Sequence, residues 1–194
     1  MSLLTRVVDG RIVPVSATWN IDAGHTSAAF GVRHLLTLMR GRFRKLSGAI
    51  VITEDPAQSS VEVTIDAASI DTANEGADKT LRGEAFLNVE EHPEVTFRST
   101  SVIPSEKGRW TVTGPLTIAG ITREVELDTE FLGAVTSPLG ELKKMSLVAT
   151  TRITREQFGI TMTAEAPDMP GVYIIGNNID ITLDIEADLE GSGS

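Results

Sequence analysis

The sequence predicts an all-β protein of about eight antiparallel strands, closed into a barrel or packed as a sandwich. The clearest sign is segment 178–189, where apolar side chains at odd positions alternate with polar ones at even positions. Such alternation is typical of a strand with one buried face. Segments 61–67 and 110–118 show the same period, and Ala119-Gly120 fits a tight hairpin turn. Apolar residues at helical spacing occur only over short stretches.

The stretch 22–43 begins as a strand and then changes period. Trp19 and Ile21 start this strand, and 28–32 continue it after the turn-prone Ala23-Gly24. The next apolar residues follow helical spacing and are closed by a glycine: Leu35, Leu36, Leu38 and Met39. We therefore expect a short helix over 35–39, lying across one end of the barrel.

The remaining elements are expected in a simple order. Apolar positions change parity between Phe43 and Leu46, which predicts a bulge or kink near Arg44-Lys45. Asp71-Thr72 could cap a weak helix over 74–85 that packs near the first helix. We expect the apolar rim of the barrel mouth to consist of Leu35, Leu36, Leu38, Leu81 and Phe86. Further strands are expected around 95–99, 110–118, 121–131, 145–153 and 179–189.

The length of 194 residues fits one domain. We assign residues 17–190 to the barrel, 1–16 to a loosely held N-terminal arm and 191–194 to a flexible tail. Charged residues interrupt the first eighteen positions before a signal-peptide core could form, and no apolar run has the length of a membrane span. The sequence therefore predicts a cytoplasmic protein without stable membrane insertion.

Composition excludes several kinds of function. Without cysteine, the chain has no disulfide, thiolate metal site or thiol nucleophile. The net charge of −10 argues against nucleic-acid binding and against broad adsorption to anionic membranes. Aromatic residues make up only 5% of the chain, so the inward positions are mainly aliphatic. This composition favours a cavity, although a solid aliphatic core would explain it as well.

Motifs along nearly the whole chain resemble the YceI-like family. The opening signature comprises Trp19-Asn20-Ile21-Asp22, His25, Phe30, Val32-Arg33-His34-Leu35 and Gly41-Arg42-Phe43. Later matches are Ala68–Thr72, Pro93–Ser99, Gly114–Thr122 and Arg155–Gly159. The resemblance implies an extended, lipocalin-like antiparallel barrel with small helices near one end. It also implies binding of a long isoprenoid lipid, such as a polyprenyl pyrophosphate or an isoprenoid quinone, and fits a homodimer, although the oligomeric state stays open.

We expect this lipid to be stored or transported in the pore, with no cofactor and no catalytic residues. The expected pore and rim residues are Phe30, Val32, Leu35, Leu38, Ile50, Val63, Leu81, Phe86, Phe97, Leu116, Leu147 and Phe158. The expected head-group residues are His25, Arg33, His34, Asp78 and Arg82. In the family's Arg-Asp-x-His-Leu-Arg run, Ala77 and Thr80 replace the first arginine and the histidine, which predicts altered or weak head-group recognition.

Two other classes of function stay open. His25, His34 and Asp78 could form a metal site, but they lack the spacing of known ligand motifs. Asp22, His25 and Ser27 supply the residue types of a nucleophilic triad, but no nucleophile elbow accompanies them. A small-molecule or metal-dependent enzyme is therefore one alternative. The other is a solid-cored interaction module that uses its acidic outer face.

Overall fold

The computed structural model describes residues 4–105, 108–138 and 140–192. Its strands are β1 (Thr5–Val8), β2 (Arg11–Pro14), β3 (Ala17–Ile21), β4 (Ser27–His34), β5 (Thr37–Phe43), β6 (Leu46–Ile52), β7 (Ser60–Asp66), β8 (Ile70–Asp71), β9 (Glu94–Arg98), β10 (Ser101–Pro104), β11 (Arg109–Ile118), β12 (Ile121–Thr136), β13 (Lys143–Thr154) and β14 (Ile175–Leu189). The helices are α1 (Glu75–Arg82) and the short 3-10 turns η1 (Pro56–Gln58), η2 (Ala67–Ser69) and η4 (Arg155–Phe158).

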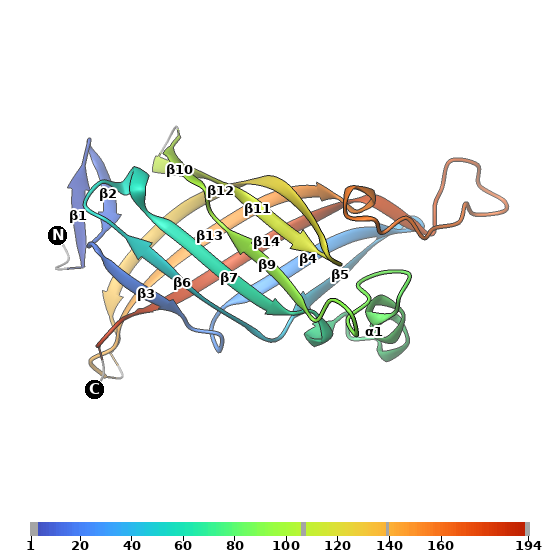
Figure 1. Ribbon diagram of the computed structural model, residues 1–194, viewed down its shortest axis with the longest axis horizontal. Helices are drawn as coiled ribbons and strands as arrows, with labels where there is room; N and C mark the ends of the chain where they lie inside the picture. The colour runs from blue at the N-terminus through green and yellow to red at the C-terminus, as the bar shows by residue number, and fades with distance from the viewer. Residues whose placement is uncertain (1–3, 106–107, 139, 193–194) are drawn as a thin grey trace.

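The strands form a closed, elongated antiparallel barrel (Figure 1). Along the barrel wall, the order is β13, β12, β11, β9, β7, β6, β3 and β14, and β14 pairs with β13 to close the circle. On its other side β14 pairs with both β3 and β4, because these two segments lie end to end along it. The prediction of an all-β, eight-stranded, lipocalin-like barrel is confirmed.

Several barrel strands are interrupted along their length. β5 gives way to β6 at Arg44-Lys45, where the chain bends as predicted. The Ser69 hydroxyl accepts hydrogen bonds from both backbone amides there, at 3.2 and 3.1 Å. Ser69 belongs to η2, which interrupts the neighbouring strand between β7 and β8. Ser69 thus supplies acceptors for both amides where the wall bends, through its hydroxyl and, for Arg44, also through its carbonyl oxygen.

The predicted helix over 35–39 is wrong. β4 and β5 form a hairpin whose ladder runs to the pair His34↔Thr37, so only Leu35 and Leu36 form the turn. Met39 faces the cavity, whereas Leu38 is exposed on the outside. The helical spacing is therefore accidental: it combines two turn residues with two strand residues on opposite faces. The ladder satisfies more backbone groups than a single helical turn could.

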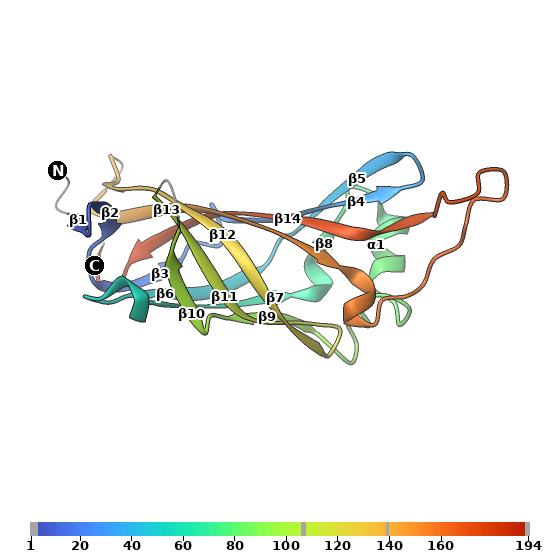
Figure 2. The ribbon, with the colours of Figure 1, turned by 90° about the horizontal axis from the view of Figure 1, so that it is seen from above.

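The second predicted helix is confirmed in a shorter form, as α1. Its N-cap is Asn74, whose side chain accepts from the Ala77 amide, rather than the expected Asp71-Thr72. Asp71 instead pairs with Arg44 at 2.6 Å. α1 ends before Gly83 and lies at the same end of the barrel as the tip of the β4–β5 hairpin (Figures 1 and 2).

The described part of the N-terminal arm, residues 4–16, is not loosely held, contrary to expectation. β1 and β2 form a hairpin at the end of the barrel opposite α1 (Figure 1). Val13 is 2% exposed, and the Arg6 guanidinium donates to the carbonyl oxygens of Thr53 and Glu54. In the predicted tail, Ser192 donates to the Leu189 carbonyl, while residues 193–194 lie outside the described part of the chain.

Apolar clusters occupy both ends of the barrel. At the arm end, Trp19 and Met145 are almost completely buried together with Leu4. At the α1 end, Phe86 and Leu87 pack with Ile70 and Ile160. Within the described residues, no helix is long and apolar enough to cross a membrane.

Gly114 is required where β9 leads into β10. A Cβ atom at this position would overlap the Arg98 carbonyl oxygen and lie 2.9 Å from the Ser99 Cα. Because backbone atoms cannot yield as a flexible side chain can, we expect Gly114→Ala to lower the free energy of unfolding by about 1–3 kcal/mol. Urea denaturation should show this loss, and Gly140→Ala is the control because the space around Gly140 is open. If both variants are equally stable, Gly114 of β11 does not lie against the backbone of Arg98 and Ser99 as described.

Candidate functional site

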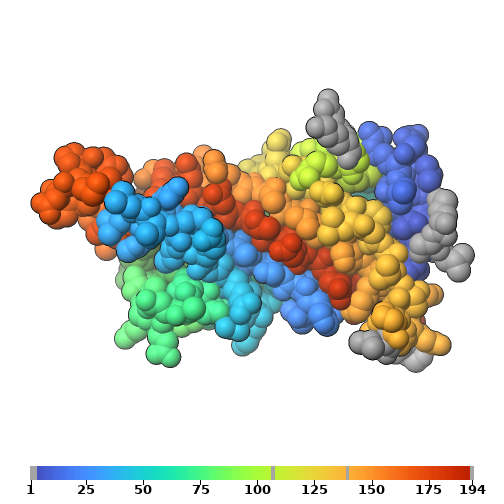
Figure 3. Space-filling model, turned by 180° about the vertical axis from the view of Figure 1, so that it is seen from behind, coloured from blue at the N-terminus to red at the C-terminus, as the bar shows by residue number. Residues whose placement is uncertain are grey.

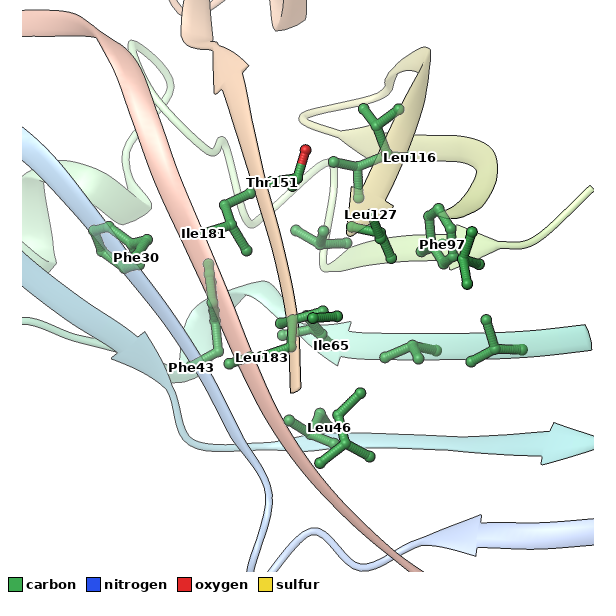
Figure 4. Close-up of a pocket in the computed structure, with 18 of the residues that line it drawn as sticks. Phe30, Phe43, Leu46, Ile65, Phe97, Leu116, Leu127, Thr151, Ile181 and Leu183 are labelled. Atoms are coloured by element: carbon green, nitrogen blue, oxygen red, sulfur yellow. The ribbon is translucent and has the colours of Figure 1, made fainter. Parts of the chain in front are cut away.

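The interior of the barrel contains a cavity of about 280 Å³. This volume is close to the lower end of the range of small-molecule pockets, about 300–1,000 Å³. Side chains from strands all around the wall point into it (Figure 4), and those labelled there are Phe30, Phe43, Leu46, Ile65, Phe97, Leu116, Leu127, Thr151, Ile181 and Leu183. Ordinary protein interiors are close-packed, so a void of this size is a candidate site for an apolar molecule.

The cavity runs between the two ends of the barrel. Val13 and Pro14 of β2 line it at the arm end, while Leu81 and Phe86 line it at the α1 end. Since the wall residues that face inward are almost all aliphatic or aromatic, the interior offers few hydrogen-bond partners to a ligand. The shape and chemistry fit a long apolar chain.

Most of the expected pore residues lie around this cavity. The ten that line it are Phe30, Val32, Ile50, Val63, Leu81, Phe86, Phe97, Leu116, Leu147 and Phe158. Leu35 and Leu38 do not: they are 42% and 38% exposed on the β4–β5 hairpin. Their expected position at the rim depended on the helix over 35–39, which is not formed. Contact of the ten with a ligand stays a prediction.

Arg82 and Asp78 are held by the protein itself. Arg82 Nε and Nη2 donate to the carbonyl oxygens of Ala68 and Ile70, both at 2.8 Å. The Asp78 carboxylate accepts from the backbone amide and hydroxyl of Thr72, at 2.8 and 2.6 Å. These bonds fasten α1 to the strand beside it. They give the two residues a structural explanation without a head group.

The other three expected head-group residues lie away from the cavity lining. Arg33 and His34 are exposed at the tip of the β4–β5 hairpin, where Arg33 Nη1 donates to the Leu36 carbonyl. His25 lies on the outer surface, and its Nδ1 is 2.7 Å from an Asp22 carboxylate oxygen. The structure therefore does not bring the five residues together at one mouth.

Arg155 lines the cavity, although the sequence placed it only in a family motif and not among the expected site residues. It is 3% exposed and is the one charged residue among the described residues that line the cavity. Its guanidinium donates to four carbonyl oxygens, those of Ile160, Met162, Ile175 and Gly176. Arginine has five N–H groups, so one is left over. In the sequence, a buried arginine that follows an apolar strand cannot be distinguished from an exposed arginine at the end of a strand.

A charge cluster lies on the outer wall near the interruption between β3 and β4. Lys144 Nζ is 2.7 Å from Asp188, 2.8 Å from Glu186 and 3.0 Å from Asp22. Asp22, His25 and Glu186 could by proximity hold a metal ion. The lysine ammonium, however, already serves as the cation for these carboxylates, so the arrangement is explained as an ion-pair network.

The network changes the pKa values of its members. Partial burial would raise the pKa of the Asp22 carboxyl, but hydrogen bonds from His25, Lys144 and the Gly24 amide outweigh it and lower the pKa to about 2. Burial would lower the pKa of Lys144, but its hydrogen bonds to Asp188, Glu186 and Asp22 raise it. The hydrogen bond to Asp22 raises the pKa of His25.

Removal of Arg82 tests its structural role. Arg82→Ala deletes two hydrogen bonds from a charged donor, so we expect a loss of about 1.5–3 kcal/mol in the free energy of unfolding. The affinity for pyrophosphate-headed and neutral lipids should change equally. Urea denaturation and a fluorescence titration measure the two effects, with Lys79→Ala on the exposed face of α1 as the control. If the stability is unchanged and only the affinity for the pyrophosphate-headed lipid falls, Arg82 binds the head group as the sequence predicted.

Removal of Lys144 tests the outer network. In the folded protein the pKa of Asp22 falls from 3.8 to about 2, so its contribution to stability is complete above pH 3.8 and is lost as the pH falls through 2. At neutral pH we expect Lys144→Met to cost about 1–2 kcal/mol, after allowance for solvent screening. The difference from wild type should shrink below pH 4 in pH-dependent thermal unfolding. Lys143→Met, at the exposed neighbouring position, should show no such pH dependence.

Comparison with known proteins gives a consistent identification. A family model described as the YceI-like domain matches residues 19–187. A UPF0312 protein of Vibrio parahaemolyticus is 36% identical over 149 residues, which cover 75% of this chain and 78% of that protein. Protein YceI of Salmonella arizonae is 35% identical over 151 residues, which cover 76% and 78%.

Solved structures share the fold. Burkholderia cenocepacia BcnA superposes with a TM-score of 0.74 at 21% identity, covering 86% of this chain and 99% of that one. A polyisoprenoid binding domain from Saccharophagus degradans gives 0.64 at 13% identity, covering 90% and 99%. The Campylobacter jejuni YceI protein gives 0.66 at 25% identity, covering 81% and 90%. With its apolar barrel and its match over residues 19–187, the chain belongs to the YceI family.

Proposed function

We propose that this protein binds one long-chain isoprenoid lipid inside its barrel and stores or transports it. The observation that carries the proposal is the elongated cavity, whose described lining is apolar apart from a few hydroxyl groups and Arg155. The structural similarity to a polyisoprenoid binding domain supports the choice of ligand class. A solid-cored interaction module is disfavoured because the interior is not filled.

Burial of the chain supplies the driving force for binding. Each methylene removed from water contributes about 0.8 kcal/mol, so a chain of several isoprene units can bind tightly without polar contacts. The cavity should therefore select for length and shape before head group. Binding also needs no reacting groups: the described lining contains no carboxylate, histidine or lysine, which favours a carrier over an enzyme.

The polar end of the lipid would lie near Arg155 or in solvent. Arg155 belongs to the α1 half of the cavity, because its hydrogen-bond partners include Ile160 and Ile175, which pack near Phe86. Its one remaining N–H can donate to a quinone carbonyl or to a phosphate oxygen. The bond to phosphate is charge-assisted and therefore stronger, so we expect a modest preference for the anionic head group. A cytoplasmic location and a homodimer stay predictions from the sequence.

Extraction of the folded protein tests the ligand class directly. Organic extraction followed by mass spectrometry should release an isoprenoid lipid in about equimolar amount. A titration with a quinone and with a polyprenyl pyrophosphate then compares the head groups. Release of a straight-chain fatty acid would keep the cavity but overturn the isoprenoid assignment.

A variant that fills the cavity tests whether the barrel is hollow. Leu183 lines the middle of the cavity, whereas the neighbouring Asp184 is exposed. Leu183→Trp should lower lipid affinity at least tenfold, or about 1.4 kcal/mol, while Asp184→Trp leaves it unchanged. In the ligand-free protein, Leu183→Trp should also keep or raise the melting temperature, because the larger ring fills empty space. A solid core would show the opposite, a loss of about 1–3 kcal/mol from overpacking.

A further inference from the structure

Exposed apolar side chains gather at the α1 end of the barrel. Seven of the thirteen large hydrophobic residues exposed in the described part of the chain belong to two segments there: Leu35, Leu36, Leu38, Met162, Met169, Tyr173 and Ile174. The two segments touch, because the Leu35 amide donates to the Ile174 carbonyl at 3.0 Å. Figure 3 shows them side by side, projecting beyond the barrel wall. We call this surface the apolar tip.

The turn of the β4–β5 hairpin contains a leucine, Leu35, at a position where glycine or asparagine would be less strained. Leu35 has a φ angle of +52°, in the left-handed region that glycine or asparagine adopts at lower cost. Two-residue hairpin turns favour glycine and asparagine for this reason. Leu36 is 62% exposed, so it does not contribute to a core that would offset the strain. Backbone strain without a packing explanation points to a functional role for the side chains.

The charge of the hairpin is opposite to that of the whole chain. Residues 27–43 contain Arg33, Arg40 and Arg42 and no acidic residue, in a chain of net charge −10. Arg42 pairs with Asp71, whereas Arg33 and Arg40 form no ion pair with any described residue. The apolar turn is therefore flanked by cations that are free to meet an anionic surface. The tip's own acids are Glu165 and Asp168, and Glu165 accepts from the Gly171 amide.

The apolar tip is continuous with the cavity. The inner face of the same hairpin contributes Phe30, Val32 and Met39 to the cavity lining. A partner that covers the tip would thus touch the element that forms one wall of the lipid site. Tyr173, the chain's one tyrosine, lies half exposed on this tip, and tyrosine is favoured at the interface between membrane and water.

We propose that the apolar tip docks onto the surface of an anionic phospholipid bilayer. Leu35 and Leu36 insert among the acyl chains near the head groups, and Arg33 and Arg40 contact lipid phosphates. The acidic outer wall does not prevent this, because charges more than about 8 Å from the surface are screened at physiological ionic strength. Docking orients the α1 end of the cavity toward the membrane. Docking of the tip involves phospholipid and does not depend on which ligand the cavity binds.

The test uses the full chain with vesicles of phosphatidylcholine, with and without phosphatidylglycerol, in a sedimentation assay. The wild type should bind, and it should bind better when phosphatidylglycerol is present. The double variant Leu35→Gly/Leu36→Asn places favoured residues in the turn, so its melting temperature should equal or exceed that of the wild type. Its partition coefficient should nevertheless fall at least tenfold.

Two further variants separate the apolar and charged contributions. Leu132→Asn is the matched control, because Leu132 is 58% exposed on β12, far from the tip, and it should bind like the wild type. Arg40→Gln should weaken binding to the anionic vesicles about fivefold and leave neutral vesicles unaffected.

Three results would overturn the proposal: absence of vesicle binding by the wild type, equal binding by the double variant, or a lowered melting temperature of that variant, which would show that the leucines serve the fold. A dimer in analytical ultracentrifugation that the double variant dissociates, without vesicle binding, would assign the tip to a second copy of the chain.

Discussion

Closure of the barrel by β14 is the constraint on which the rest of the structure depends. This strand pairs with β13 along one edge and with β3 and β4 along the other, so the main wall closes on itself. The short strands β8 and β10 pair along one edge each, with β5 and β11. Closure also fixes the direction of each side chain. From Ile179 to Ile185 the odd positions of β14 line the cavity, and acidic residues occupy even positions 180, 184, 186 and 188, which explains why one strand is both apolar and acidic.

A closed barrel of this size must either fill its interior or enclose a ligand. Here the two ends are filled and the middle is not. Trp19 and Met145 pack at one end, Phe86 and Leu87 at the other, and the cavity lies between them. The end clusters allow the protein to keep its shape around an unfilled middle. The same division limits the length of the space between the two clusters.

The strands of the barrel wall could be predicted from the sequence because side chains in a strand alternate between two faces. Alternation over 179–189 predicted β14, and the parity change after Phe43 predicted the bend at Arg44-Lys45. It was insufficient at residues 35–39, because two turn residues beside two strand residues imitate helical spacing, and only the pairing of β5 with β4 distinguishes them. The hairpin formed by 5–14 was missed since its strands are four residues each, too short for a clear period.

The head-group residues were harder to predict for a different reason. Arginine and aspartate have the same appearance in sequence whether they bind a ligand or backbone. Arg82 donates two of its five N–H groups to the carbonyl oxygens of Ala68 and Ile70, and Asp78 accepts from Thr72. Neither residue lines the cavity, whose wall is mainly apolar, and apolar contact is nondirectional. Any preferred orientation of the molecule must come from its outer surface, where charge and apolar groups are unevenly distributed. Carboxylates cover the outer face of β14, while the hairpin at the α1 end carries arginines beside exposed leucines. An elongated molecule with this distribution presents one end to an apolar, anionic surface and keeps its wall in water.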